Sequence, residues 1–134
     1  MGSQARYVAI VDDDEFVRTG LAALLRAYGF ETRAYASGPD FLKALPFAVP
    51  DCLIVDVDMP GMTGLDLQRE LLRRGLHIAT VVMTGSDDKA TRDTCRALGA
   101  IACLRKPLQG DTLLATINSC VDASRAPSMR ARGA

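Results

Sequence analysis

The run Cys52-Leu53-Ile54-Val55, which is followed at once by Asp56, decides the fold class of this chain. All four residues of the run are apolar, so it offers no polar face to water. A strand that is buried on both faces is typical of the centre of a parallel sheet covered by helices on both sides. The run therefore predicts an α/β architecture with a carboxylate at the end of its central strand.

Three further apolar runs end in polar residues in the same way: residues 8–11 before Asp12 and Asp13, residues 80–83 before Thr84, and residues 101–104 before Arg105 and Lys106. Open parallel sheets bind ligands outside the carboxyl ends of their strands, where the strand order reverses. We therefore expect the four endings to meet, which brings carboxylates, a hydroxyl and an ammonium group to one place. Such a set of groups suits a cation and a phosphoryl group.

Between these runs, apolar residues recur at helical spacing. Strands are predicted near residues 8–11, 30–36, 52–55, 78–83 and 101–104, and helices near residues 17–28, 40–45, 64–74, 87–98 and 111–122. The Ser-Gly-Pro segment at 37–39 is predicted to form a turn. Five strand–helix units with short links and right-handed crossovers predict a doubly wound, flavodoxin-like α/β fold. Its five-stranded parallel sheet has the order 2-1-3-4-5 and packs against five helices.

The predicted helix at 87–98 has a thin apolar stripe, formed by little more than Ala90, Thr91, Cys95 and Leu98. Weak burial implies low local stability, so this helix can move or fray at little cost. The helix follows Thr84 directly in the sequence. A change at Thr84 therefore has a short route to a movable element.

The composition is typical of an ordinary soluble domain. The 134 residues are 49% hydrophobic and 24% charged, and 16 basic residues balance 16 acidic ones. This balance gives no overall attraction for nucleic acid or for an anionic membrane. No apolar run approaches the roughly 20 residues of a membrane-spanning helix, and the first residues lack the apolar core of a secretory signal. We expect a cytoplasmic protein without direct nucleic-acid or membrane binding.

The four cysteines, Cys52, Cys95, Cys103 and Cys120, are widely spaced and form no CxxC pair. We interpret them as small buried hydrophobic residues rather than as a disulfide framework. The sequence leaves a redox role for Cys95 or Cys103 open.

The acidic residues at the strand ends predict a Mg²⁺ site. Mg²⁺ prefers hard oxygen ligands and takes one or two carboxylates together with phosphate oxygens. Asp12, Asp13 and Asp56 would supply that shell, and the metal would relieve the repulsion among three like charges. Asp56 then becomes a nucleophile that can form an aspartyl phosphate. The Lys106 ammonium and the Thr84 hydroxyl would bind phosphoryl oxygens.

Each ending taken alone has an ordinary structural explanation. Asp12 and Asp13 alone fit a solvated turn as well as a metal site, and the residues after the other strands are common loop signals. Asp14 and Glu15 are interpreted as the cap and the first turn of the first helix, and we leave them outside the site. The occurrence of all four endings, in order, is what favours a shared site.

With these motifs in place, residues 7–121 resemble the receiver domain of two-component response regulators, of the CheY-like and FixJ-like kind. The matching motifs are Val-Asp-Asp-Asp-Glu at 11–15, Ile-Val-Asp-Val-Asp-Met-Pro-Gly-Met-Thr-Gly at 54–64, Met-Thr-Gly at 83–85 and Arg-Lys-Pro-Leu at 105–108. The resemblance implies a phosphorylation-activated signalling switch. It also implies that the protein is not an enzyme toward other substrates and promotes only its own phosphotransfer and dephosphorylation.

The resemblance assigns roles to the acidic residues. It implies that Asp56 is the phosphoacceptor and that Asp12 and Asp13 are the acidic pair that binds Mg²⁺. The backbone carbonyl of Asp58 would complete the metal shell.

The resemblance also makes Thr84 the switch hydroxyl and Lys106 the phosphate-binding lysine, and it implies a cis Lys106–Pro107 bond. Two positions depart from the family pattern. Cys103 stands where the family usually has Tyr or Phe, and Leu108 replaces a frequent Phe. A thiol cannot make the inward swing of an aromatic ring, so we expect the signal to leave by another route, for example through the helix after Thr84.

The partners implied by the resemblance are a sensor histidine kinase or a phosphotransfer protein as donor, and a downstream protein or a fused output domain as target. A phosphorylation-dependent homodimer is also compatible with it. The readout would be a changed surface on the fourth helix, the fifth strand and the fifth helix. We expect residues 1–122 to form the receiver domain, and residues 123–134 to be a short C-terminal tail or a truncated linker.

Two other functions fit parts of the sequence. Asp56-Val57-Asp58 matches the minimal Asp-x-Asp pattern of haloacid-dehalogenase-like phosphohydrolases, although that family places the pattern on its first strand rather than its third. A receiver-shaped interaction module that phosphate does not switch is the second alternative, and Cys103 is the residue that supports it.

Overall fold

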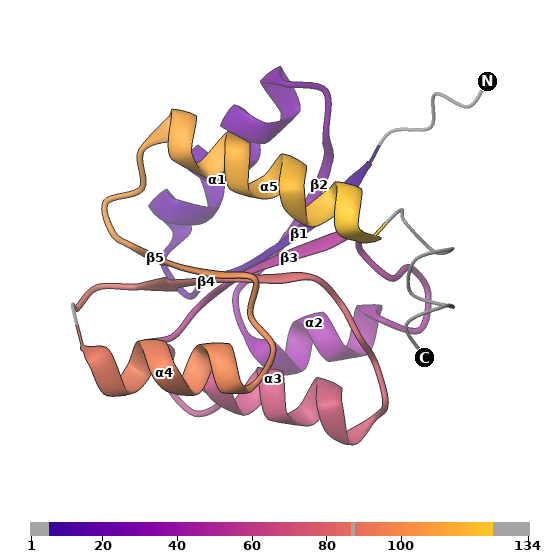
Figure 1. Cartoon of the computed structure of the whole chain (residues 1–134). Helices are drawn as coiled ribbons and strands as arrows, with labels where there is room; N and C mark the ends of the chain where they lie inside the picture. The colour runs from indigo at the N-terminus through magenta and orange to yellow at the C-terminus, as the bar shows by residue number, and fades with distance from the viewer. Residues whose placement is uncertain (1–5, 87, 125–134) are drawn as a thin grey trace.

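Strands and helices alternate along the described part of the chain, residues 6–86 and 88–124 of the computed structural model (Figure 1). The strands are β1 (Tyr7–Val11), β2 (Glu31–Tyr35), β3 (Cys52–Asp56), β4 (Thr80–Thr84) and β5 (Ala102–Arg105). The helices are α1 (Glu15–Ala27), α2 (Gly38–Ala44), α3 (Gly64–Arg73), α4 (Lys89–Ala97) and α5 (Gly110–Ser124). The strands pair in parallel in the order β2-β1-β3-β4-β5. The predicted doubly wound, flavodoxin-like fold is confirmed.

The helices cover both faces of the sheet. Helices α1 and α5 lie on one face, and α2, α3 and α4 lie on the other (Figure 1). Alternate residues of the central strands supply two separate apolar clusters. Ile54 packs with the helices of the first face, and Leu53 and Val55 pack with those of the second. This two-sided packing is the physical reason why β3 has no polar position before its end.

Burial falls from the centre of the sheet to its edges. Every residue of β3 and β4 is buried. The edge strand β2 is largely exposed, and no residue of the other edge strand, β5, is fully buried. The carboxyl ends of β3 and β4 are therefore fixed by packing on both sides.

The structure corrects two predicted boundaries. Ser37 caps α2, so Gly38 and Pro39 form the first turn of that helix rather than a separate turn. A proline fits there because the N–H that it lacks would have no partner within the helix. Strand β4 begins at Thr80, which pairs with Leu53, and it includes Thr84, whereas the prediction ran from 78 to 83.

Helix α4 has the thin burial that its sequence predicts. Its only buried residue is Cys95. The helix starts at Lys89 after the cap residue Asp88, and the predicted start at Asp87 lies outside the described residues.

Cys52, Cys95 and Cys120 are buried as predicted, Cys103 is half-buried, and all four are free thiols. Helix α5 continues to Ser124, and the rest of the predicted tail, residues 125–134, lies outside the described residues. Among the helices of the described ranges, none is both long and apolar enough to cross a membrane.

Candidate functional site

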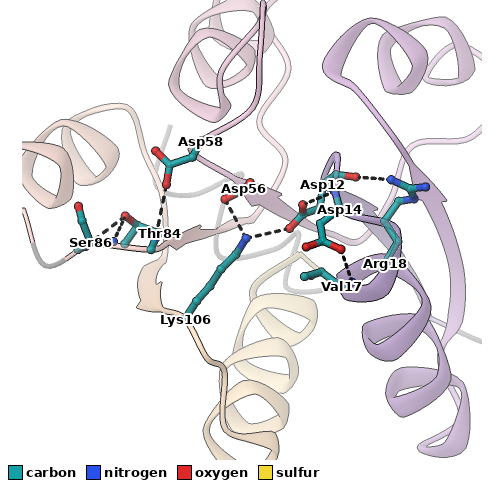
Figure 2. Close-up of polar contacts among 10 residues, drawn as sticks. Asp12, Asp14, Val17, Arg18, Asp56, Asp58, Thr84, Ser86 and Lys106 are labelled. Carbon is teal, nitrogen blue, oxygen red and sulfur yellow. Dashed lines mark hydrogen bonds and ion pairs between the residues drawn. The ribbon is translucent and has the colours of Figure 1, made fainter.

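Four strand ends converge at the carboxyl edge of the sheet (Figure 2). Asp12 follows β1, Asp56 closes β3, Thr84 closes β4 and Lys106 follows β5. Because β1 and β3 are neighbours in register, with Val11 opposite Val55, the residues that follow them are adjacent. The sheet order therefore places the predicted groups together as expected.

Three carboxylates gather at the centre of this edge. Ligand oxygens of Asp12, Asp13 and Asp56 all lie within 4.8 Å of one another. Asp12 is 0% exposed and Asp56 is 2% exposed, whereas Asp13 is exposed to solvent. The cluster thus has two enclosed carboxylates and one at its mouth.

Lys106 joins the two enclosed carboxylates. Its Nζ atom lies 3.2 Å from Oδ2 of Asp12 and 3.2 Å from Oδ1 of Asp56. Burial alone would lower the pKa of Lys106, but the hydrogen bond to Asp12 and the charge of Asp56 outweigh it, so the pKa is raised. The ammonium therefore stays charged at neutral pH and holds the pair.

Asp56 is less easily ionised than an ordinary carboxyl group. Burial raises its pKa, the negative charge of Asp12 raises it further, and Lys106 and the backbone N–H of Asp58 oppose these two effects only in part. One ammonium does not fully compensate three carboxylates that lie this close. The site has an excess of negative charge.

The excess charge and the donor set fit a hard divalent cation. Within the described residues, Oδ1 of Asp56 is buried and accepts no hydrogen bond of good geometry, although it forms the ion pair with Lys106. Carboxylate oxygens are the ligands that Mg²⁺ prefers. Asp12, Asp13 and Asp56 are therefore the side chains that could hold it.

Asp58 stands apart from the three clustered carboxylates. Its Oδ2 accepts a hydrogen bond from the backbone N–H of Gly85 at 3.5 Å, so its side chain is turned toward the loop after β4 (Figure 2). The predicted contribution of Asp58 to a metal shell is through its backbone carbonyl, which this side-chain position leaves possible.

Thr84 bonds within its own loop. Its hydroxyl donates to the carbonyl of Ser86 at 3.2 Å and accepts from the N–H of Ser86 at 3.2 Å. The hydroxyl is buried and faces away from Lys106 (Figure 2). A phosphoryl group on the sheet edge would have to draw this hydroxyl away from Ser86.

The backbone around Asp12 is tied to helix α1. Asp14 caps the helix, as predicted, by accepting from the N–H of Phe16 at 2.8 Å. Oδ1 of Asp12 accepts from the N–H of Asp14 at 2.9 Å, and Nη1 of Arg18 donates to the carbonyl of Asp12 at 2.8 Å. Sequence reasoning missed Arg18, whose only signal is its position one helical turn after the cap.

Helix α3 presses on the backbone of Asp56 from the other side. A Cβ atom at Gly64 would lie 2.5 Å from the carbonyl oxygen of Asp56. Only glycine allows this approach. The same helix begins with a capping box formed by Thr63 and Asp66, which fixes its first turn.

An apolar groove of about 550 Å³ opens beside Lys106, between α1 and the segment that follows β5. Phe16, in the first turn of α1, lines it and is 91% exposed. Leu24, Met83 and Leu108 form other parts of its wall. Sequence reasoning did not find this groove, although Phe16 falls outside the apolar period of its helix.

Comparisons with known proteins agree with this geometry. Residues 8–118 match the family described as response regulator receiver domain. The chain is 37% identical over 117 residues to the transcriptional regulatory protein FixJ of Azorhizobium caulinodans, covering 87% of this chain and 56% of that protein. It is 36% identical over 120 residues to nodulation protein W of Bradyrhizobium diazoefficiens, covering 88% and 52%. The chain therefore spans about half the length of the curated relatives it matches.

Solved structures give the same result. The FixJ-N crystal structure matches with a TM-score of 0.82 and 31% identity, covering 89% of this chain and 95% of that one. A response regulator receiver protein from Burkholderia phymatum matches with a TM-score of 0.78 and 38% identity, covering 87% and 95%. The chemotaxis protein CheY4 of Vibrio cholerae matches with a TM-score of 0.82 and 27% identity, covering 87% and 99%.

Proposed function

Because this chain belongs to the family of response regulator receiver domains, we propose that it is a phosphorylation-activated signalling switch whose phosphoacceptor is Asp56. The observation that supports the assignment is the position of this carboxylate. Asp56 closes the central strand, is enclosed, and has an oxygen 3.2 Å from the Lys106 ammonium. Asp12, the other enclosed carboxylate of the cluster, lies just beyond the end of β1 and not within a strand.

The proposed reaction needs positioning and charge neutralisation more than covalent chemistry. An oxygen of Asp56 attacks the phosphorus of a donor phosphohistidine, and the phosphorus–nitrogen bond breaks as the new phosphorus–oxygen bond forms. The donor imidazole leaves with the electron pair and takes up a proton. Lys106 keeps its ammonium beside the transferred group. Bound Mg²⁺, held by Asp12, Asp13, Asp56 and the backbone carbonyl of Asp58, would neutralise charge on the phosphoryl oxygens.

The switch follows from competition for the Thr84 hydroxyl. In the unphosphorylated chain this hydroxyl donates to the carbonyl of Ser86. A dianionic phosphoryl group is a stronger acceptor than a carbonyl oxygen. Thr84 therefore turns toward Asp56, and the loop that leads to α4 changes shape. Differential contacts of this kind shift an equilibrium between two loop arrangements.

The proposed readout is the surface formed by α4, β5 and α5. Cys103 stands on β5 at the position where the family usually has an aromatic residue, and a thiol has no ring to swing inward. We therefore place the main response in α4, whose single buried side chain makes its displacement inexpensive.

The proposed partners are a histidine kinase or phosphotransfer protein as donor, and a downstream protein, a fused output domain or a second copy of the chain as target. The groove beside Lys106, with Phe16 exposed at its rim, is a suitable place for a donor protein to dock. We propose a cytoplasmic setting, in which the chain acts as phosphoacceptor and not as an enzyme on other substrates. The balanced charge supports an interaction with proteins rather than with nucleic acid.

The test is phosphate incorporation followed by intact mass, with a small-molecule phosphodonor, with and without Mg²⁺. The native chain should gain one phosphoryl group only with Mg²⁺, and Asp56→Asn should gain none. Asp93→Asn, which removes an exposed carboxylate of α4, is the matched control and should label normally. Labelling of Asp56→Asn at the native rate would overturn the assignment. Continuous release of phosphate from a phosphomonoester would instead indicate the phosphohydrolase, and partner binding that ignores phosphorylation would indicate the unswitched module.

A further inference from the structure

The only buried side chain of α4 is a thiol that has a second thiol beside it. Cys95 is completely buried. It belongs to the apolar cluster on the α2–α3–α4 face of the sheet, and Cys103 of β5 packs against that same cluster. Cys103 pairs in register with Val82, which is another member of the cluster. The two cysteines therefore share one apolar cluster, at the place where α4 contacts the edge strand β5.

The backbone holds Cys95 in this position. Its carbonyl oxygen accepts a hydrogen bond from Nε2 of Gln68 at 3.2 Å, which ties α4 to α3. It also accepts from the N–H of Ala100 at 3.0 Å, which closes the end of the helix. The chain then returns directly into β5, so Cys103 comes back under the helix only eight residues later in the sequence.

The two thiols differ in their access to solvent. Cys95 is enclosed, and burial together with the neighbouring Cys103 thiol raises the pKa of Cys95 to about 12. Cys103 is half-buried on an edge strand and has a route to solvent. A dissolved oxidant therefore meets Cys103 first, and Cys95 lies behind it. Because the raised pKa keeps Cys95 protonated, Cys95 can close a bond to an oxidised Cys103 only as it gives up its proton, so this second step is the slow one.

A second pair of cysteines lies on the opposite face and provides an internal comparison. Cys52 of β3 and Cys120 of α5 belong to the other apolar cluster, and both are completely buried. Each thiol is the neighbour of the other, and that contact together with burial raises the pKa of Cys52. Neither sulfur of this pair is exposed, so a water-borne oxidant has no point of attack.

We propose that Cys95 and Cys103 are a redox modification site, at which a hydroperoxide oxidant converts the two thiols into a reversible disulfide. This inference does not depend on the role of Asp56. It assigns a chemical use to Cys103, one of the two positions at which the chain departs from the family pattern.

The reaction proceeds in two steps. The Cys103 sulfur attacks one oxygen of hydrogen peroxide, the oxygen–oxygen bond breaks, and a sulfenic acid and one water form. The Cys95 sulfur then attacks the Cys103 sulfur, the sulfur–oxygen bond breaks, and the hydroxide leaves as water with the proton of Cys95. The two thiols lose two electrons and two protons in total, and the peroxide is reduced to two waters.

The disulfide would fasten α4 to β5. It joins the sole buried side chain of a weakly packed helix to the edge strand through a short closed loop. A cross-link of this kind restricts the opened states of the segment that it spans. Oxidation would therefore restrict the movement of α4 relative to β5.

The experiment treats the reduced chain with hydrogen peroxide and maps its tryptic peptides without reduction. Trypsin cuts after Arg92, Arg96 and Arg105, so the disulfide should join peptide 93–96 to peptide 97–105. The joined peptide should disappear after treatment with a dithiol, while Cys52 and Cys120 remain free for alkylation after unfolding. In hydrogen exchange, the amides of α4 should exchange about tenfold more slowly in the oxidised chain.

Cys103→Ser is the matched variant, because a half-buried position accommodates a hydroxyl of similar size. This variant should give no joined peptide and no slowing of exchange in α4. Cys95→Ser should leave Cys103 without a partner, so that it proceeds to the sulfinic acid. If Cys95→Ser does not fold, the peptide maps of the native chain and of Cys103→Ser still show whether the disulfide forms. Sulfinic acid at Cys103 in the native chain without any joined peptide, or a disulfide between Cys52 and Cys120, would overturn the proposal.

Discussion

The two halves of the carboxyl edge of the sheet are packed very differently. On the β1–β3 side, every residue from Val8 to Val11 and every residue of β3 is buried, and Gly64 brings α3 against the backbone of Asp56. On the α4–β5 side, the helix has one buried residue and the strand has none. Under the proposed function, the phosphoacceptor lies where the backbone is tightly packed, and the response falls where movement costs little.

The loop after β4 connects these two halves. Thr84 closes a fully buried strand, and its hydroxyl bonds to Ser86. Asp58 reaches across from the β3 side to the N–H of Gly85. If the two halves divide the work in this way, substitutions in the first half change the rate of phosphorylation and substitutions in the second half change the response.

The largest effect is expected for Lys106→Gln, which removes the ammonium that reaches from the end of β5 to the two enclosed carboxylates of the rigid half. Phosphate incorporation should slow by about 100-fold, because a group that stabilises developing charge typically contributes this much. The rate is measured by intact mass with a small-molecule phosphodonor and Mg²⁺. Lys89→Gln removes an exposed lysine of α4 that pairs with Asp93, and it should label at the native rate. Equal slowing in both variants would mean that the rate of labelling depends on the overall charge of the chain and not on the ammonium at the site.

The next effect concerns the tight packing of the rigid half. Gly64→Ala places a methyl group 2.5 Å from the carbonyl oxygen of Asp56, so the first turn of α3 must shift. We expect the free energy of unfolding to fall by about 2 kcal/mol, measured by urea denaturation.

Gly20→Ala is the control for that substitution. Gly20 lies inside α1 with nothing near its added Cβ atom, and alanine favours a helix. This variant should be more stable than the native chain by about 0.5–1 kcal/mol. A native-like stability of Gly64→Ala would show that the close approach does not constrain Asp56.

A smaller effect is expected from neutralising Asp56 in the metal-free protein. Asp56→Asn should raise the free energy of unfolding at neutral pH by about 1 kcal/mol, because it removes a buried charge that Lys106 compensates only in part. Unfolding in urea without divalent cations measures this difference, and added Mg²⁺ should reduce it.

The pH dependence of this difference gives a check on its cause. The pKa of Asp56 is raised in the folded chain, so the folded state binds a proton more tightly than the unfolded state does. The cost of its charge therefore develops as the pH rises above the ordinary carboxyl value of about 3.9 and is absent below it. The advantage of Asp56→Asn should shrink toward pH 4. An advantage that does not change with pH would point to packing instead of charge.

Most of the fold and the acidic site follow from the sequence because they depend on periodicity. An apolar run without a polar face places β3 at the centre, and the parallel order then brings Asp12 and Asp56 together. The start of α2 was missed because Pro39 has the same local signature in a turn and in a first helical turn. Side-chain directions within loops could not be predicted, since the turn of Asp58 toward Gly85 depends on the shape of two loops.

Contacts between distant elements were the other limit. The position of Cys95 beside Cys103 depends on how α4 is rotated over the sheet. The stripe of Ala90, Thr91, Cys95 and Leu98 is too thin to fix the helical phase from sequence. The cap at Asp14, in contrast, is a local property and was predicted correctly.

The smallest effect on chemistry is expected for Thr84→Ala. In the unphosphorylated chain the hydroxyl bonds to its own loop, so its removal should change the rate of phosphate incorporation by less than about threefold. Ser86→Ala keeps the carbonyl that Thr84 contacts and serves as the control. A loss of labelling as large as that of Lys106→Gln would place Thr84 in the chemical step instead of the response.

The most direct test of the division between the two halves is hydrogen exchange of the reduced chain before and after phosphorylation. We predict that exchange changes in Lys89–Ala97 and in Ala102–Arg105, while β1, β3 and α3 keep their protection. Changes confined to the β1–β3 half, or spread evenly over the sheet, would contradict the account.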